Sequence, residues 1–335
     1  MQEKIKSILR IVLFAAIGFF LFWLVYKDQP INQLVIALKE ANYFYIALSV
    51  VVSFISHWSR AHRWNILINS LGYYPKFKNT LFSIFIMYLS NTAIPRSGEV
   101  ARCGVLKKYE NVPFSQLIGT VIVERVFDFL MLFVFLGIVL FTQFGIIGEF
   151  LKNNPDTGKK LEFLLQARIW IILVLLLVLS ISAIFLLRNK FKNFVLFVKI
   201  KEFLKNILEG IKTVKKLEKK WQFLFHSVFI WVLYFVTIYL VFQSFEFTRH
   251  LTLLTGLTVF VMASFGMVAP SPGGIGTWHF MVIETLVIYG IQKNPDANTF
   301  ALVAHGSMTL FLIIMGLISV ILLPIYNKKA VKIAS

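Results

Sequence analysis

The 335-residue sequence contains a single cysteine, Cys103, and only 16 acidic residues against 34 lysines and arginines. One cysteine excludes an internal disulfide and a metal site built from several thiolates. The sequence also has no H-E-x-x-H, no G-x-S-x-G, no P-loop and no Cys/His metal set. We therefore expect no cofactor and no metal, and the motifs place the chain in no enzyme class.

Hydrophobic residues, by contrast, make up 58% of the chain and include 35 phenylalanines. Several apolar runs reach the ~20 residues that cross the hydrocarbon core of a bilayer. The sequence thus predicts an all-α polytopic membrane protein, a single transmembrane domain over 1–335. The net charge of +18 is better explained by lysines and arginines on cytoplasmic loops than by nucleic-acid binding.

Six apolar segments are expected to be full spans, the first of them a retained span and not a cleaved signal peptide: 8–26, 42–60, 119–142, 167–187, 222–243 and 299–326. Two further apolar regions, 80–118 and 252–291, are interrupted by proline and glycine. The chain thus has about six spans and two interrupted hairpins, or eight spans if both regions cross.

Basic residues set the expected orientation, since they accumulate in cytoplasmic loops. They place both termini and the segment 59–80 in the cytoplasm. The charges after Pro95 stay on that side only if 80–118 enters and leaves by the cytoplasmic face. The region 252–291 must then enter and leave by the external face, as a re-entrant hairpin or as two short spans.

The two halves of the chain repeat this order with opposite orientation. The segments 42–142 and 222–326 each contain a span, an interrupted hairpin and a second span. Inverted repeats with interrupted segments in matching places point to a transport site near the membrane midplane; two unrelated proline kinks are the alternative. Between the halves, 188–220 is a basic amphipathic segment expected to lie on anionic headgroups.

The first hairpin carries the stretch PRSGEVAR, residues 95–102. Pro95 suits the first position of a helix, which would place Arg96, Glu99 and Arg102 on one broad face. Glu99 could then pair with either arginine and leave the other guanidinium as an anion receptor. The alternative is a solvated loop with ordinary charges.

The next span begins with a second charged group, Glu124, Arg125 and Asp128. Glu124 and Asp128 are one helical turn apart and face the same way. Charged residues within a span usually face a bundle interior or a polar cavity. They could balance Arg96 or Arg102, hold a substrate cation or relay protons, or they could form a purely structural ion pair.

The second hairpin contains PSPGGIGTWHF, residues 270–280. Gly273, Gly274 and Gly276 permit a tight turn and a close backbone approach to a ligand, and Thr277 could cap the following helix. His279 is the titratable residue beside the turn and a candidate for ligand contact, whereas a membrane histidine such as His305 is more often a packed polar contact.

These stretches, PRSGEVAR, VERVFD (123–128) and PSPGGIG, resemble the lysylphosphatidylglycerol synthase transmembrane-region family, a flippase-like integral membrane family. The resemblance covers nearly the whole chain and implies paired re-entrant elements and translocation of a lipid. Many relatives carry a glutamate soon after the glycine turn, where this chain has His279. The chain also ends at Ser335, which implies a stand-alone membrane domain without the aminoacyl-transferase domain.

From the residues and the resemblance together, we expect a lipid flippase of the bacterial cytoplasmic membrane. Its substrate would be a phospholipid such as aminoacylated phosphatidylglycerol, or a polyprenyl-phosphate-linked lipid. Its partners would be membrane lipids and anionic headgroups on the cytoplasmic face, with homo-oligomerisation as a further possibility. The alternatives are an integral-membrane enzyme of lipid-linked sugar metabolism and a non-transporting assembly protein.

Overall fold

The structure is a computed structural model that describes residues 31–153, 212–269 and 271–327, together with Phe20, Trp23 and Gly210. Every regular element in these ranges is a helix. The predicted spans 8–26 and 167–187 lie outside the described residues, apart from Phe20 and Trp23, as does most of the basic segment 188–220.

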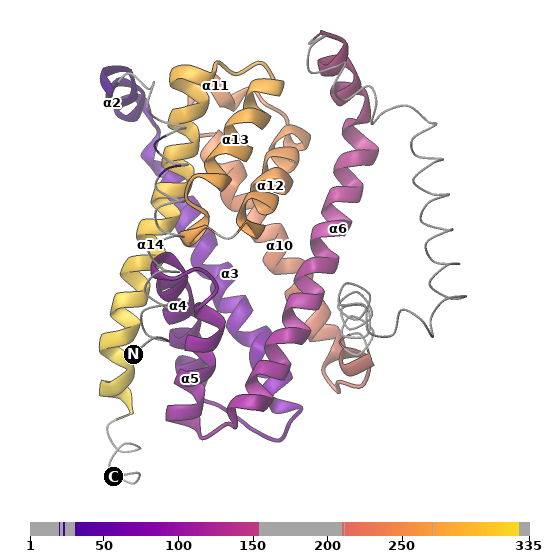
Figure 1. Cartoon of the computed structure of the whole chain (residues 1–335), viewed down its shortest axis with the longest axis vertical. Coiled ribbons are helices and arrows are strands. Elements are labelled where there is room, and N and C mark those ends of the chain that lie inside the picture. Colours follow the sequence, from indigo (N-terminus) through magenta and orange to yellow (C-terminus); the bar gives the residue numbers. More distant parts are fainter. Residues whose placement is uncertain are drawn as a thin grey trace, which may run out of the picture.

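Within each half of the chain, the described helices follow one another with short connections (Figure 1). The first half contains α2 (Ile31–Glu40), α3 (Tyr43–Asn69), α4 (Phe77–Ala93), α5 (Gly98–Glu110) and α6 (Phe114–Asn153). The second half contains α10 (Lys220–Phe242), α11 (Glu246–Arg249), α12 (Leu253–Val268), η1 (Pro272–Gly274), α13 (Thr277–Ile288), η2 (Lys293–Ala297) and α14 (Asn298–Tyr326).

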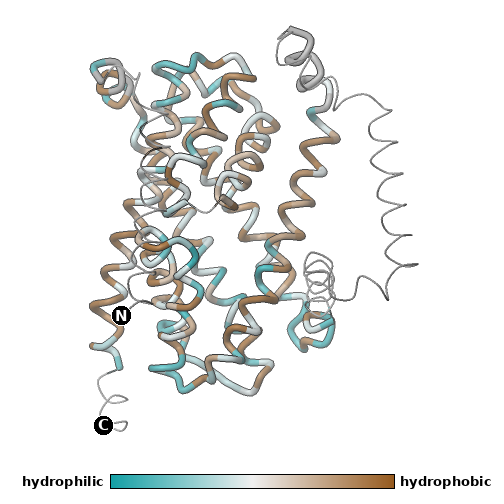
Figure 2. The backbone as a smooth tube through the Cα atoms, viewed as in Figure 1, coloured by the Kyte–Doolittle hydropathy of each residue, from teal (hydrophilic) through white to brown (hydrophobic). Residues whose placement is uncertain are grey.

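Three described stretches are long and apolar enough to cross a membrane: Phe114–Gln143, Lys220–Phe242 and Lys293–Tyr326. Figure 2 shows hydrophobic residues along α6 and α14 and hydrophilic residues gathered toward both ends of the bundle. Exposed side chains such as Phe133, Phe141 and Ile321 cover these helices with apolar surface, as expected of helices that face lipid. The chain is therefore a multi-pass membrane protein.

Helix α3 is longer than the predicted span 42–60. It continues to Asn69 and buries Arg60 and Arg63, which were counted among the charges of the segment 59–80. The two arginines are paired with a carboxylate of α6, and the cytoplasmic placement of 59–80 stays a prediction. Helix α3 ends at Asn69, and the turn that follows it contains Gly72 in a positive-φ conformation.

Two helical hairpins enter the bundle from opposite ends (Figure 1). Helix α4 packs against α5, and α12 packs against α13. Helices α5, α12 and α13 have 13, 16 and 12 residues, and at 1.5 Å per residue each is shorter than a full crossing. These lengths suit re-entrant hairpins, which stay a prediction, as do the inverted repeats 42–142 and 222–326.

The tips of the two hairpins contact each other. The Arg96 guanidinium donates a hydrogen bond to the carbonyl of Val268, the last residue of α12 (Nη2–O 3.2 Å). Gly273 of the other tip lies beside Thr92 near the end of α4. The two hairpins, which are far apart in the sequence, thus touch at their tips.

One end of the bundle is strongly basic. It combines the start of α4, the end of α5 and the segment before α10, and its lysines are Lys76, Lys78, Lys107, Lys108, Lys212, Lys215, Lys216, Lys219 and Lys220. The end of α14 lies there too, since Asn327 exchanges amide hydrogen bonds with Asn79 of α4. We refer to it as the basic end.

Candidate functional site

Five charged side chains form a buried ionic cluster between α3, α5 and α6. Arg102 pairs with Glu124 (Nη2–Oε2 2.6 Å). Arg63 bridges both carboxylates, with 3.3 Å to Glu124 and 2.8 Å to Asp128. Arg60 completes the cluster with a 2.6 Å contact to Asp128. Of the roles considered for the α6 carboxylates, balancing Arg102 agrees with the position of Glu124, whereas Asp128 pairs with other arginines.

Helical spacing brings the five groups together. Glu124 and Asp128 are one turn apart on α6, and Arg60 and Arg63 are three residues apart on α3, so each pair shares a helix face. Arg102 projects from the second turn of α5. Helix α5 packs against α6, and so does α3, which leaves most of the cluster buried between these helices.

Tyrosine and serine hydroxyls complete the shell around the arginines. Arg60 donates to the hydroxyls of Tyr88 on α4 and Tyr234 on α10, at 2.8 and 2.9 Å. Arg63 donates to Ser227 on α10 at 3.4 Å. The Arg102 guanidinium lies over the Trp64 ring, 4.3 Å from its centroid. The cluster therefore ties five helices, α3, α4, α5, α6 and α10, to one another.

Positive charge is in excess within this cluster. Three guanidinium groups face two carboxylates, so the net charge of the cluster is +1. The side chains of Arg63, Arg102 and Glu124 are 0% exposed. Among the described residues, Nε and Nη1 of Arg102 and Nε of Arg60 and Arg63 have no hydrogen-bond partner. Buried donors without acceptors are costly, so the cluster has unused capacity for an anion.

Arg125 and Glu99 form the rim of the cluster. Their ion pair is 3.7 Å long, and their side chains are 44% and 26% exposed. Arg125 also lies 3.7 Å from Asp128. Glu99 was expected to pair with Arg96 or Arg102, but its ion-pair partner is Arg125, because Arg102 is turned toward Glu124. These two side chains are more exposed than the five members of the buried cluster.

Arg96 lies apart from the cluster, at the hairpin tip. A helix starting at Pro95 was expected, with Arg96, Glu99 and Arg102 on one face, but α5 starts at Gly98 and Arg96 occupies the left-handed region with φ +62°. Gly98 packs so closely on α4 that a Cβ there would overlap the Met87 carbonyl. Helix α5 thus starts at Gly98, where the absence of a side chain lets its backbone pack directly on α4.

The glycine turn forms the other tip. Gly273, Gly274 and Gly276 have φ of +57°, +81° and +84°, the left-handed conformation that glycine adopts at no steric cost. His279 accepts a hydrogen bond from the Gly276 amide at Nδ1 (3.3 Å). His305 of α14 lies 2.9 Å from the Gly273 carbonyl through Nε2. Two histidines therefore hold the turn, and His305 is a polar contact as expected.

Thr277 does not cap α13 as expected. Gly276 occupies the N-cap position, and the Thr277 hydroxyl donates to the carbonyl of Gly266 in α12 at 2.8 Å. Gly266 itself lies against the backbone of Thr277 and Trp278. This hydroxyl thus links the two arms of the second hairpin.

The sequence prediction missed Arg60, Arg63, Tyr88 and Tyr234. A signal for the two arginines was present, because no glycine or proline follows Tyr43 until Gly72. An unbroken helix of that length places Arg60 and Arg63 within it and not beyond its end. For the tyrosines no local signal exists, because their role depends on the packing of α4 and α10 against α3.

The fold and the cluster together define an all-helical, multi-pass membrane protein with a buried ion network. The chain belongs to the family described as the lysylphosphatidylglycerol synthase TM region, whose model matches residues 7–316. The resemblance of the three sequence motifs to this family is thereby confirmed.

Three relatives show how far the similarity extends. One UPF0104 membrane protein of Methanocaldococcus jannaschii is 25% identical over 289 residues, which cover 80% of this chain and 81% of that protein. A second UPF0104 membrane protein of this organism is 28% identical over 240 residues, 68% of this chain and 93% of the relative. Glycosyltransferase AglD of Haloferax volcanii is 30% identical over 110 residues, 32% of this chain and 18% of AglD. No solved structure matches the chain.

Proposed function

We propose that the protein translocates a phosphate-bearing lipid across the cytoplasmic membrane. The candidate substrates are aminoacylated phosphatidylglycerol and a polyprenyl-phosphate-linked lipid. The observation that carries the proposal is the excess of positive charge in the buried cluster, together with the unpartnered guanidinium nitrogens of Arg102.

The charge balance favours an anionic ligand. An uncompensated buried charge is strongly unfavourable, and a phosphate would both neutralise the remaining +1 and accept hydrogen bonds from the unused donors. Guanidinium groups bind phosphate through two parallel hydrogen bonds. In this proposal Arg102 is the principal phosphate-binding residue, Arg60 and Arg63 support it, and Glu124 and Asp128 hold the arginines in place when no lipid is bound.

The hairpin tips supply the second part of the proposal. Irregular backbone at membrane depth is tolerated where it is buried in protein or lines a wet cavity, and transporters with inverted repeats place their sites at such breaks. Arg96 and the turn of Gly273, Gly274 and Gly276 join the two tips. We propose that this contact separates during transport, while a headgroup enters past the rim formed by Glu99 and Arg125.

A translocation assay on proteoliposomes tests the proposal. Arg102→Lys retains the charge but loses the planar fork, so we expect it to slow the transfer of fluorescent phosphatidylglycerol about tenfold or more. Arg249→Lys is the matched control, because Arg249 is exposed and, within the described residues, its side chain donates to the Gln243 carbonyl. Full transfer activity in a folded Arg102→Lys protein would contradict the proposal, and loss of folding in this variant would instead support the assembly-protein alternative.

The partial match to glycosyltransferase AglD favours a second candidate, an enzyme acting on lipid-linked sugars. The geometry supports it less well. An acid or base needs a carboxylate free to exchange a proton, whereas Glu124 and Asp128 are each paired with two or more arginines. Formation of a glycolipid by the purified protein, absent in Asp128→Asn, would favour the enzyme.

A further inference from the structure

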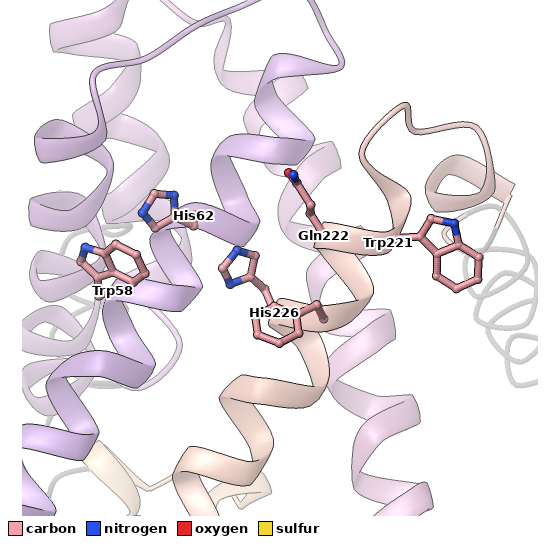
Figure 3. Close-up of a pocket in the computed structure, with 6 residues that line it drawn as sticks. Trp58, His62, Trp221, Gln222 and His226 are labelled. Atoms are coloured by element: carbon pink, nitrogen blue, oxygen red, sulfur yellow. The ribbon is translucent and has the colours of Figure 1, made fainter.

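A pocket of about 520 Å³ lies between α3 and α10, near the basic end. Its lining residues are Trp58, His62, Trp221, Gln222, Phe225 and His226. Figure 3 shows His62 of α3 facing His226 of α10, with Trp58 beside His62, Gln222 at the start of α10 and Trp221 at the outer edge. The two imidazole rings are nearly parallel, with centroids 5.8 Å apart.

This pocket is distinct from the ionic cluster. Trp58 and His62 are one turn apart on the outer face of α3, while Arg60 and Arg63 point to its inner face. On α10 likewise, Phe225 is exposed, whereas Phe223 and Ser227 are buried toward the cluster. The contact between Ser59 and His226, 2.8 Å long, lies between the two sites. The pocket therefore faces the surroundings of the bundle.

The chemistry of the lining suits a headgroup at a membrane surface. Indole rings at the water–lipid boundary are typical interfacial anchors, and imidazole and amide groups provide hydrogen-bond donors. No acidic side chain lines the pocket. The segment that leads into α10 has exposed lysines, Lys212, Lys215, Lys216, Lys219 and Lys220, against Glu218. Five lysines and one glutamate give this segment, which leads into the pocket-lining start of α10, a net charge of +4.

The surface beyond the pocket suits acyl chains. On the same face of α3, the side chains of Val51 and Ile55 are exposed, and on α10 so are Val228 and Val232. These residues continue the helix faces of Trp58 and Phe225 toward the middle of the bundle, since they precede or follow them by one or two turns. A largely aromatic pocket with a few polar groups, beside a run of lysines, thus opens onto an apolar strip.

We infer that this pocket and strip form a binding site for an anionic phospholipid of the leaflet at the basic end. Its phosphate would lie near Lys219, Lys220 and Gln222, its glycerol between Trp58 and Trp221, and its chains along the strip. Polybasic segments attract anionic lipids by about a factor of five per lysine. The inference concerns a peripheral site and does not depend on the proposed translocation.

Native mass spectrometry of the full chain in detergent tests the inference. The probes are phosphatidylglycerol and phosphatidylcholine with identical acyl chains, added in equal amounts. We expect the protein to retain phosphatidylglycerol preferentially. Trp221→Ala and the double variant Lys219→Gln/Lys220→Gln should each reduce this retention about fivefold or more. Both sites are exposed, so the variants are expected to fold, and a thermal unfolding curve checks that they do.

Matched controls localise the effect. Lys107→Gln/Lys108→Gln removes two adjacent exposed lysines from the basic end of α5, and Tyr74→Ala removes a ring that is 78% exposed, against 75% for Trp221. Both controls should keep the parent's lipid preference. Equal losses in variants and controls, or equal retention of the two lipids, would overturn the inference. A dimer that breaks up in Trp221→Ala without change in lipid retention would assign the face to a second copy of the chain instead.

Discussion

Among the three arginines of the buried cluster, Arg102 has the fewest hydrogen-bond partners. Arg60 bonds to a carboxylate and two tyrosine hydroxyls, and Arg63 bonds to two carboxylates and a serine, so that only Nε of each lacks an acceptor among the described residues. Arg102 has one carboxylate and the face of Trp64. A buried ion pair offsets its desolvation only when the remaining donors are also bonded. Arg102 therefore gains the most from an added anion.

Glu124 holds the cluster together through two arginines. In Glu124→Gln, Arg102 loses its counter-charge inside the bundle, so we expect a destabilisation of about 3–5 kcal/mol, measured as a lower midpoint of thermal unfolding in detergent. Glu246→Gln, on exposed α11, is the control and should be neutral. Adding Arg102→Met to Glu124→Gln should recover part of the loss. A single variant as stable as the parent would show that the pair is not structurally important.

Tyr234 supplies one of the two hydroxyls that satisfy Arg60. We expect Tyr234→Phe to cost about 1–3 kcal/mol, because a buried guanidinium donor loses its acceptor. Tyr239→Phe, further along the same helix, is the control. Because Tyr88 binds the same guanidinium, Tyr88→Phe and Tyr234→Phe should be non-additive in a double-mutant cycle. Additive losses in the unfolding free energy would contradict a shared network.

The two hairpins are the elements that organise the interior, and close backbone contacts hold them together. Gly98 joins α5 to α4, and Gly266 joins α12 to α13. At Gly266 an added Cβ would lie 2.8 Å from Trp278 Cα. Such contacts let each hairpin stay narrow, as is common where membrane helices pack on small residues.

Gly266→Ala tests the close packing of the second hairpin. The added methyl group meets backbone that cannot move aside, so we expect a loss of about 1–3 kcal/mol in unfolding free energy. Gly306→Ala in α14 is the matched control, because an added Cβ there meets nothing within 4 Å. That control should be neutral or slightly stabilising through helix propensity. Equal effects of the two substitutions would exclude a packing role for Gly266.

The whole molecule has one basic end and one end of mixed charge. The mixed end carries Glu246, Arg249, Glu284 and Lys293, and the last two form an ion pair of 2.5 Å. Because lysines and arginines collect on cytoplasmic loops, we predict that the basic end faces the cytoplasm and that both termini lie there.

Cysteine labelling in intact cells checks this orientation. The single, buried Cys103 allows a cysteine-free background, Cys103→Ala. We expect Gln292→Cys, at the mixed end, to react with a membrane-impermeant maleimide. Tyr74→Cys, at the basic end, should react only after the membrane is permeabilised. The reverse pattern would invert the predicted topology, and labelling of both positions from outside would contradict a single fixed orientation.

The amino-acid sequence determined the class of protein, because membrane-length apolar runs and clustered lysines are local properties. It also located the helix breaks near Pro95 and Pro272, since proline and glycine act on their own backbone. The pairing of charges was decided by tertiary structure. Arg60 and Arg63 carry the same local signal as loop arginines, and only the packing of α3 against α6 makes them partners of Glu124 and Asp128. Likewise, Glu99 pairs with Arg125, because Arg102 pairs with Glu124 across the interface between α5 and α6.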